Sequence, residues 1–407
     1  MKLRFATIIL SCFAFFGAIE NSNAQAGSDT STTVKIFRLF GKELFDANAV
    51  PFIQPLVTSI NATSNARFFN QARVPKKVET PYFRFGVHGM MGFVRDDQKT
   101  FKPSVPTRKT LDLVDVAKYG NSKFVDNKFE FEIVDTAGLV NELLKYVLYK
   151  ADQQGELDLP EDAATIFGNL ERSIPFPSSV LLKIVKEEPL FKQLSPAAQE
   201  SITNSFNNLP DRSFPLPRGQ NMSYLVAAVP QLEVGSLFGT ELLVRYIPPI
   251  VLDTSVGKFA FWGIGLKHSI TQYFEEPSFD AAIQAVYQGT SLENKVGVTG
   301  AVLKADGTIW NMNIHASKHF EGIVDIFGGF SFETLSIDAS YTYLLPQEIQ
   351  NALGIVDTKP QTSPFAISDT NYKAILGISR QFGPIAIFAD YSISKFNIFS
   401  GGIEARF

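Results

Sequence analysis

The histidines are the most informative of the few residues whose spacing could support chemistry. His315 and Ser317 stand two positions apart, so in an extended strand a base and a hydroxyl would lie on one face, an arrangement that hydrolytic sites use. The alternate residues Trp310, Met312 and Ile314 are apolar and occupy the opposite face. This pattern turns His315 and Ser317 toward the inside of a closed sheet and favours ordinary interior polarity over a catalytic pair. We therefore expect no enzyme activity.

The histidines also form no metal motif. His88, His268, His315 and His319 are not spaced as metal ligands, and Cys12 is the only cysteine in the chain. The net charge is −4, acidic and basic residues are interspersed, and no basic run is long enough to follow a phosphate backbone. We therefore expect no metal, no cofactor and no nucleic-acid partner.

The N-terminus has the pattern of a secretory signal peptide over residues 1–26. Basic residues precede an apolar run over 5–19, which is followed by a small-residue sequence that ends at Ala26. Cleavage after Ala26 would remove Cys12 and leave an exported chain that can form no disulfide.

From residue 222 onward the chain alternates between apolar and polar residues in segments of about ten residues, the pattern of an outer-membrane β-barrel. In LSIDASYTYL, for example, Leu335, Ile337 and Ala339 share one face, while Ser336 and Asp338 share the other. The chain contains 37 Phe, 12 Tyr and 2 Trp, and beyond the signal peptide it has no apolar run of about 18 residues that could form a membrane helix. We therefore predict an all-β transmembrane β-barrel in the bacterial outer membrane, in contact with outer-membrane lipid.

Counting the alternating segments gives about fourteen antiparallel strands within residues 81–407, including two weaker candidates near 105–115 and 126–135. Counted backward from the C-terminus, the turns QFGP, ETL, KADGT and GSLFG fall on the periplasmic side. The long connections 345–370 and 136–221 then both fall on the outer side, which is the asymmetry that such barrels show.

Two stretches have helical rather than strand periodicity. The extracellular connection 136–221 contains TAGLVNELLKYVLYKADQQG, with Thr136 as a candidate N-cap and Gly155 as the stop, and a second helix is expected to begin at Ser195-Pro196. This helical insertion either caps the barrel mouth or provides a docking surface for other proteins. Residues 27–80 hold a further helix in KIFRLFGKELFDA, and a periplasmic segment of that length could fold up into the lumen as a plug.

Several charged residues are predicted to face the lumen. Glu241 and Arg245 alternate with apolar residues in TELLVRYI, so they bind a polar ligand group, hold the plug, or form an ion-pair network within the barrel. Lys267 shares a face with Gly263 and Gly265, where glycines either let a ligand or plug approach the wall or allow the strand to kink. The candidate ligand-contacting residues are Arg84, His88, Glu241, Arg245, Lys267 and His315.

The segments PQLEVGSLFGTELLVRYIPPI and GIGLKHSITQYF resemble the central signature of an uncharacterised family of Gram-negative outer-membrane proteins of unknown function. The front motif of that family is matched by Pro55, Asn61, Phe68 and Phe69, although the helical insertion before PRGQ is longer here. The family is distantly similar to the long-chain fatty-acid transporter barrels. That likeness implies about fourteen strands, an N-terminal hatch and passage of hydrophobic small molecules.

The chain ends on SGGIEARF, in which Ile403 and Phe407 share the apolar face. An aromatic residue at the very end is expected where the last strand is paired on both sides and its apolar face meets an apolar environment. Ser400, Gly402, Ala405 and Phe407 resemble the insertion signal that barrel-assembly machinery reads, so this machinery is an expected partner.

Together these features predict passive uptake of a hydrophobic or amphipathic small molecule through a plugged barrel. The alternative is a structural or docking protein of the outer membrane, including one that serves a secretion pathway. A fully packed lumen, together with a helical insertion that stands away from the barrel, would favour the alternative.

Overall fold

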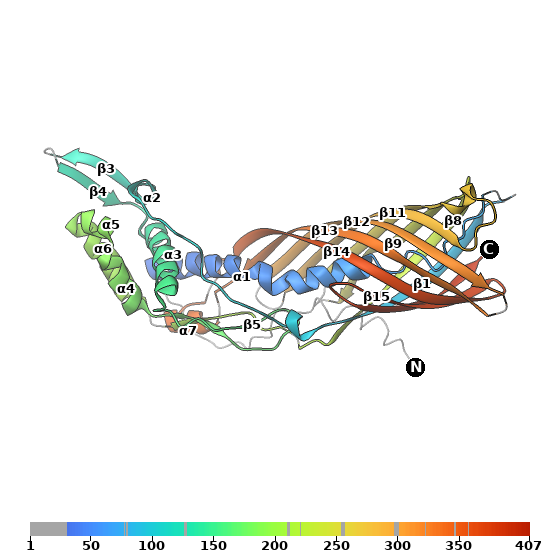
Figure 1. The fold of residues 1–407 in the computed structure, drawn as a ribbon. Coiled ribbons are helices and arrows are strands. Elements are labelled where there is room, and N and C mark those ends of the chain that lie inside the picture. The colour runs from blue at the N-terminus through green and yellow to red at the C-terminus, as the bar shows by residue number, and fades with distance from the viewer. Residues whose placement is uncertain are drawn as a thin grey trace.

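The computed structural model describes residues 31–407 apart from 77, 79, 126–127, 210–211, 220, 254–256, 297–300, 322, 346 and 357. The predicted signal peptide, residues 1–26, lies outside the described residues. Figure 1 shows a β-barrel and, beyond one of its mouths, a mainly helical region. The C-terminus lies at the opposite mouth, so we call the two ends of the barrel the helical mouth and the C-terminal mouth.

Ten antiparallel strands form the barrel, which closes because β1 pairs with both β16 and β8. The order around the wall is β1-β16-β15-β14-β13-β12-β11-β10-β9-β8. The bounds are β1 Tyr82–Phe93, β8 Tyr224–Leu237, β9 Thr240–Asp253, β10 Gly257–Ser269, β11 Asp280–Val296, β12 Ala301–Phe320, β13 Val324–Tyr343, β14 Gln361–Phe382, β15 Ile385–Ile393 and β16 Ile398–Arg406.

The prediction of about fourteen strands is therefore wrong. KADGT (304–308) lies inside β12 and ETL (333–335) lies inside β13, so neither is a turn, and these two strands each run for 20 residues. The stretch near 105–115 forms no strand. The candidate near 126–135 falls on β4 (Lys128–Ile133), which pairs with β3 (Gly120–Val125) in a separate sheet outside the barrel.

The two mouths differ in the length of their connections, as predicted. The helical region, residues 94–223, follows β1, and a connection over 344–360 follows β13; both lie at the helical mouth. The insertion is thus longer than the predicted 136–221. Short turns at GSLFG (235–239) and QFGP (381–384) join strands at the C-terminal mouth.

In the long strands β12, β13 and β14, the face that carries the apolar side chains differs between the two halves of the barrel. Near the C-terminal mouth their outward side chains are apolar, with Met312 62% and Phe330 70% exposed, while the inward Glu333 is fully buried. Near the helical mouth the pattern reverses, because Leu335 points inward and Asp338 points outward. We call the exposed apolar side chains the outer belt; it includes Phe83, Phe85, Trp262, Ile264, Trp310, Met312, Ile314, Phe330, Tyr372, Leu376, Ile387 and Ile403.

A single long helix, α1 (Thr32–Ser64), joins the helical region to the barrel. It continues through Pro51 and Pro55, although a proline has no N–H for an intrahelical hydrogen bond. The carbonyl of Ala47, which Pro51 leaves without its usual donor, accepts a hydrogen bond from Ser104 Oγ at 3.5 Å. Among the described residues we find no helix with the length and apolarity that a membrane span requires.

The N-terminal segment runs through the barrel from one mouth to the other. The C-terminal half of α1 enters through the helical mouth, and residues 65–76 continue toward the C-terminal mouth, where β1 begins at Tyr82. The N-terminal segment therefore lies in the lumen, and it enters through the mouth opposite the one at which β1 begins. The N-terminal half of α1 belongs to the helical region because its apolar side chains complete the core there.

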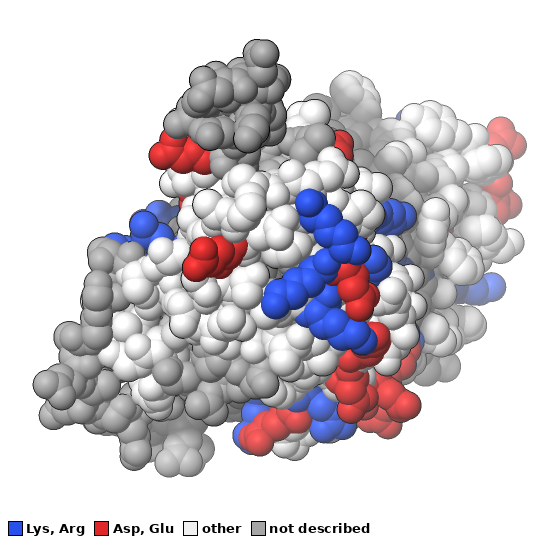
Figure 2. All heavy atoms as spheres, turned by 90° about the vertical axis from the view of Figure 1, so that its left-hand side faces the viewer, with Lys and Arg blue, Asp and Glu red and all other residues white. Residues whose placement is uncertain are grey.

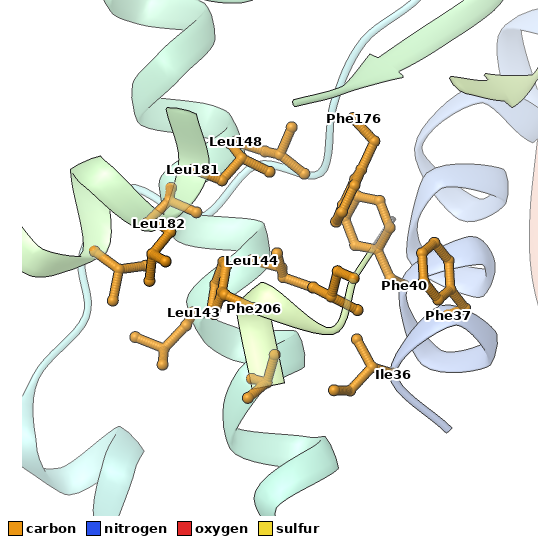
Figure 3. Packing of buried hydrophobic residues seen from close by; sticks show 14 of the residues in the cluster. Ile36, Phe37, Phe40, Leu143, Leu144, Leu148, Phe176, Leu181, Leu182 and Phe206 are labelled. Carbon is orange, nitrogen blue, oxygen red and sulfur yellow. The ribbon is translucent and has the colours of Figure 1, made fainter. Parts of the chain in front are cut away.

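The helical region contains α2 Leu113–Ala117, α3 Thr136–Gln154, α4 Ser178–Glu187, α5 Pro189–Gln193 and α6 Pro196–Asn207, and the β13–β14 connection adds α7 Gln347–Leu353. Two small sheets complete it: β2 (Thr100–Phe101) with β5 (Ala163–Ala164), and β6 (Ser173–Phe176) with β7 (Arg212–Pro215). As Figure 3 shows, the core joins α1 to α3, α4 and α6 through Phe37, Phe40, Leu144, Leu181 and Phe206.

The sequence signals for two of these helices are confirmed. Gly155 ends α3 in the left-handed conformation, with φ of 71°, and Ser195 caps α6 before the predicted proline. The N-cap of α3 is Asp135 rather than Thr136, because the Asp135 carboxylate accepts the N–H of Gly138 at 2.9 Å.

Leu144→Ala should loosen the helical region and leave the barrel closed. Leu144 is completely buried in the core between α1 and α3, and such a truncation costs about 2–5 kcal/mol. Limited proteolysis should therefore cut residues 94–223 at least about thirtyfold faster than in the wild type, which corresponds to the lower end of this cost. Val114→Ala, at a side chain 71% exposed in the same region, is the matched control and should not change the rate. Loss of the heat-modifiable barrel in Leu144→Ala would contradict separate stability of the two parts.

Candidate functional site

Residues 58–76, which we call the plug, lie in the half of the lumen nearest the C-terminal mouth, where a cavity of about 460 Å³ remains beside Gln71 and Arg73. These residues comprise the last turns of α1 and the segment that follows it. The plug contacts the wall through hydrogen bonds and an ion pair of buried side chains, and through an apolar cluster around Phe68 and Phe69. The charged side chains of the wall therefore have partners although they are shielded from water.

Arg245 on β9 holds the end of α1, where the last carbonyls of a helix have no intrahelical donor. Its guanidinium donates to the carbonyls of Ser64, Ala66 and Arg67 at 2.9, 2.7 and 2.8 Å. It also lies 4.2 Å from the centroid of the Phe68 ring. A cation at this position is favoured further by the negative end of the helix dipole.

Lys373 on β14 holds the same helix end from another side of the wall. Its ammonium donates to the carbonyls of Ala62 and Asn65 at 2.8 and 3.1 Å. It is also 2.7 Å from a carboxylate oxygen of Glu333 on β13, and both side chains are completely buried. The other oxygen of Glu333 accepts a hydrogen bond from Asn371 at 2.7 Å. Because both charges are buried, removal of either would leave the other without its counterion.

A second buried cluster of charges lies beside the plug. Lys267 on β10 is 2.6 Å from Glu241 on β9 and 3.8 Å from Glu233 on β8. Arg84 on β1 pairs with the same two carboxylates, and the hydroxyl of Tyr82 donates to Glu241 at 2.7 Å. Arg84 Nε also lies 3.8 Å from Glu404 on β16, so two cations face three carboxylates. Of the predicted roles, the structure shows the ion-pair network for Glu241, whereas Arg245 holds the plug.

Nearer the C-terminal mouth the plug contacts two further strands. Arg67 of the plug pairs with Asp390 on β15. Asn70 donates through Nδ2 to Glu404 on β16 at 3.2 Å. The plug is therefore bonded to strands on several sides of the barrel rather than to one strand.

His315 and Ser317 both contact the plug, as their predicted inward orientation requires. The ring of His315 stacks on Phe69 with the centroids 3.9 Å apart and the planes 4° from parallel. His315 Nδ1 lies 2.8 Å from Asn313 Oδ1. The hydroxyl of Ser317 accepts the backbone N–H of Ala72 at 2.8 Å. These contacts give both side chains a role in holding the plug.

His88 is the one predicted candidate that the structure does not join to the polar contacts. It is buried on β1 with its ring centroid 5.2 Å from that of Phe388. Neither ring nitrogen has a hydrogen-bond partner among the described residues. A Cβ at Gly86 would lie 2.8 Å from His88 Nε2, so the glycine makes room for the imidazole.

The glycines of β10 make room for neighbouring side chains. A Cβ at Gly263 would lie 2.9 Å from Cγ of Gln288, and the amide of Gln288 donates to Asn65 of the plug at 3.2 Å. The register with β9 is regular at Gly263 and shifts only nearer the start of β10. The glycine therefore serves a wall residue that holds the plug, and strand kinking does not explain it.

Between the plug and the helical mouth, the lumen contains an apolar cavity of about 130 Å³. α1 packs against β1, β13 and β14, so the cavity opens between α1 and the opposite wall. Leu56 and Ile60 line it from α1, and Leu225, Phe261 and other residues of β8 to β13 line it from the wall. No lining residue is charged.

The last strand closes the barrel, as its sequence predicts. Phe407 exchanges two backbone hydrogen bonds with Phe83, at 2.9 and 3.1 Å. Ser400 faces the lumen, and Phe407 points outward with its side chain 77% exposed. A Cβ at Gly402 would come within 2.5 Å of a backbone oxygen on β1, so only glycine fits there. The role of these residues and of Ala405 in assembly stays a prediction.

Comparison with known protein families identifies the family of this chain. The family of unknown function DUF6588 matches residues 1–407. The chain belongs to this family. No curated protein matches it. The predicted membership in an uncharacterised family is confirmed at this level, and the further likeness to transporter barrels stays a prediction.

Residues from the segments that resemble the family lie together in the lumen. Glu241 of the GTE block and Lys267 of the KHSI block form the ion pair at 2.6 Å. Asn61 of the front motif donates to the Asp369 carboxylate on β14 at 2.8 Å. The segments that are most specific to the resemblance therefore build the plug and the wall that holds it.

Sequence reasoning missed Glu333, Lys373, Asp369 and Asp390 as lumen residues. The signal was present for Lys373, which alternates with apolar residues in NYKAIL just as Arg245 does in TELLVRYI. Glu333 was not predicted to face the lumen because ETL was predicted to be a turn.

Proposed function

We propose that this protein is an outer-membrane β-barrel through which hydrophobic or amphipathic small molecules pass. The observation that carries the proposal is the uncharged cavity between α1 and the wall. Protein interiors are close-packed, so a barrel that serves only as a scaffold has no need of such a space. An apolar cavity is also poorly suited to water and well suited to a hydrophobic guest.

The outer belt supports the membrane location. Large contiguous apolar surfaces are rare on soluble monomers. Here they surround the half of the barrel whose interior is polar, with Trp310, Met312 and Ile314 outside and Asn311 and Asn313 inside. This is the distribution expected where the outside of a barrel meets lipid tails.

The plug limits the route that a molecule could take. Residues 58–76 lie across the half of the lumen nearest the C-terminal mouth and are bonded to several strands. Passage to the C-terminal side therefore requires the plug to move. The cavity would hold a molecule on the other side of the plug before that step.

A docking role has one observation in its favour, since the helical region stands beyond the barrel mouth and has a core of its own. Figure 2 looks onto this end and shows basic and acidic side chains side by side on a largely uncharged face. In the helical region, Lys145 pairs with Glu142 at 2.6 Å. Side-chain hydrogen bonds from Lys118 and then Arg108 lower the pKa of Asp115 to about 2. Such paired charges give a partner no large patch of one sign, and the lumen is not fully packed, so docking is the second candidate.

Mass spectrometry of compounds that stay with the protein after purification from outer membranes in detergent tests the proposal. The variant Ala305→Phe places a ring in the cavity and should reduce a retained compound about tenfold, because overfilling a packed site costs about 1–3 kcal/mol. Ala285→Phe, on the exposed outer face of β11, is the matched control and should retain it. If all three proteins carried only bulk membrane lipid, docking would replace uptake as the first candidate.

A further inference from the structure

The cavity of about 460 Å³ at the C-terminal mouth is polar, unlike the apolar cavity on the other side of the plug. The ends of β1, β11, β12, β13, β14 and β16 surround it, and Gln71, Arg73 and Pro75 line it from the plug. Sites for small ligands are commonly cavities of about 300–1,000 Å³. This cavity therefore has the size of a ligand site.

The charges around this cavity do not balance. Its lining includes five residues with a full charge: Arg73, Arg380, Arg406, Asp280 and Asp325. The carboxylate of Asp325 lies 2.6 Å from Nδ1 of His319, and Asp280 interacts electrostatically with Arg73 of the plug. Three guanidinium groups and two carboxylates leave one positive charge without a counterion when His319 is neutral.

Arg380 and Arg406 are the cations that the protein does not neutralise. Among the described residues, neither side chain forms an ion pair or a hydrogen bond. The guanidinium of Arg406 lies 4.3 Å from the ring centroid of Tyr82, and that of Arg380 lies 5.2 Å from the ring centroid of Phe382. A guanidinium that stacks on a ring keeps its N–H edge free for an anion. The Tyr82 ring is itself held in place, because its hydroxyl donates to Glu241.

The two guanidinium groups come from opposite faces of the barrel wall. The hydroxyl of Ser379 bonds to the plug, so the neighbouring Arg380 points outward. Glu404 is buried in the lumen, so Arg406, two positions later, points inward. Both line the cavity because it lies at the rim, where β14 ends at Phe382 and β16 ends at Arg406. A ligand that contacts both arginines therefore lies at the rim of the barrel and not deep in the lumen.

Exposed apolar side chains border the same cavity. Phe320, Ile323 and Phe382 line it. They continue the outer belt to the C-terminal mouth, since Ile326 on β13 and Ile378 on β14 are also exposed. Aromatic residues at the edge of such a belt lie near the level of lipid headgroups. A ligand that fits this cavity therefore has an anionic group for the arginines and an apolar chain for the belt.

We propose that this cavity binds the phosphodiester headgroup of an anionic phospholipid. The inference rests on the proposed function for the membrane position of the belt, and it adds a specific lipid partner. A phosphodiester carries one negative charge, which balances the excess positive charge of the cavity. Its oxygens point in several directions and can accept hydrogen bonds from guanidinium groups on different sides, whereas the two oxygens of a carboxylate lie in one plane. A bound headgroup would lie against Gln71 and Arg73 of the plug.

Native mass spectrometry of the full-length protein in octyl glucoside tests this site, with dihexanoyl phosphatidylglycerol as the probe. Wild-type protein should bind this lipid about tenfold more tightly than dihexanoyl phosphatidylcholine, whose ammonium group offsets the phosphate charge. Arg380→Gln and Arg406→Gln should each weaken the binding of phosphatidylglycerol about tenfold, because each removes hydrogen bonds to a charged group. Arg406→Lys keeps the charge without the planar donors and should restore part of the affinity.

Lys318→Gln is the matched control. Lys318 is an exposed cation on β12 at the same mouth, with its ammonium 5.8 Å from the ring centroid of Phe320, but it does not line the cavity. This variant should bind phosphatidylglycerol as the wild type does. Heat-modifiable migration establishes that each variant is folded. Arg380→Gln changes a side chain outside the lumen, so it tests the site even if Arg406→Gln does not fold.

Two further probes identify the source and the chemistry of the anion. Glycerophosphoglycerol is the same headgroup without acyl chains, and it should bind about tenfold more weakly than the lipid. Equal binding of the two would overturn the lipid in favour of a soluble phosphodiester. Dodecanoate should also bind more weakly, and affinity equal to that of phosphatidylglycerol would overturn the assignment to phosphate.

The site itself would be overturned by equal affinity for phosphatidylglycerol and phosphatidylcholine, by unchanged affinity in the arginine variants, or by an equal loss in Lys318→Gln. Uptake fails separately. If phosphatidylglycerol binds as expected but purified protein retains no compound in the apolar cavity, the headgroup site stands and the proposed function falls. If the lipid does not bind but Ala305→Phe reduces a retained compound, the headgroup site falls and the proposed function stands.

Discussion

Deletion of Phe407 is expected to leave the protein without a heat-modifiable barrel in the outer membrane. Phe407 exchanges two backbone hydrogen bonds with Phe83 where the barrel closes. Its ring is 77% exposed, so the ring itself contributes little to packing within the protein. Phe407→Ala keeps both backbone bonds and removes only the ring. If Phe407→Ala also fails to assemble, the ring is needed for recognition by the assembly machinery rather than for stability of the folded barrel.

The matched control for this prediction is Phe399→Ala, which removes another outward ring from the same strand, 48% exposed. It should assemble normally. Fractionation of membranes followed by electrophoresis with and without heating measures the outcome. A normal heat-modifiable band for the chain without Phe407 would refute the proposed assembly signal.

Lys373→Met is expected to release the plug and make the barrel conduct ions. The substitution leaves Glu333 buried without its counterion and removes the donor for the carbonyls of Ala62 and Asn65. Breaking a buried pair from one side costs about 3–5 kcal/mol. If that cost falls on the plugged state, the fraction of open barrels rises about a hundredfold or more. Conductance of single barrels in planar bilayers measures this change.

Two further variants make the conductance experiment specific. Lys304→Met removes an ammonium from the pair with Glu293, at 3.7 Å on the exposed surface, and should leave the barrel closed. Glu333→Gln added to Lys373→Met removes the orphaned charge and should restore part of the closure. Unchanged conductance in Lys373→Met, or equal conductance in the single and double variants, would contradict this account of the plug.

Whether most wall side chains point into the lumen or outward could be predicted from the sequence, because period-two alternation depends only on the strand itself. Glu241, Arg245 and Lys267 were placed in the lumen on this basis, and all three are buried there. Their partners could not be predicted, because they depend on the register between strands and on the path of the plug. Arg245, for example, bonds to carbonyls that are about 180 positions away in the chain.

The number of strands could not be predicted because glycines and charged residues occur both in turns and within strands, where they serve packing or ion pairs. Gly307 made KADGT look like a turn, but a Cβ there would lie 2.9 Å from Thr290 Cγ2, so the glycine serves packing between β11 and β12. Glu333 made ETL look like a turn, but its carboxylate is the buried partner of Lys373. In both places a tertiary contact explains the residue that local turn chemistry was expected to explain.

The path of α1 was the least predictable feature. Pro51 and Pro55 favour a helix end near residue 50, and nothing local announces that Ser104 supplies a donor to the carbonyl freed by Pro51. The division of α1 between two cores follows from contacts with residues more than a hundred positions away.

The passage of the N-terminal segment from one mouth to the other also constrains the order of assembly. In the folded protein, β1 and β16 close the barrel with the N-terminal segment inside it. Once the helical region has folded onto the start of α1, and β1 has paired with its neighbours, the segment is anchored at both mouths. The N-terminal segment then passes through the closed barrel and is held in place at both mouths. Threading must therefore precede the last of these two events, and the plug can shift within the lumen but cannot leave it in one piece while both anchors hold.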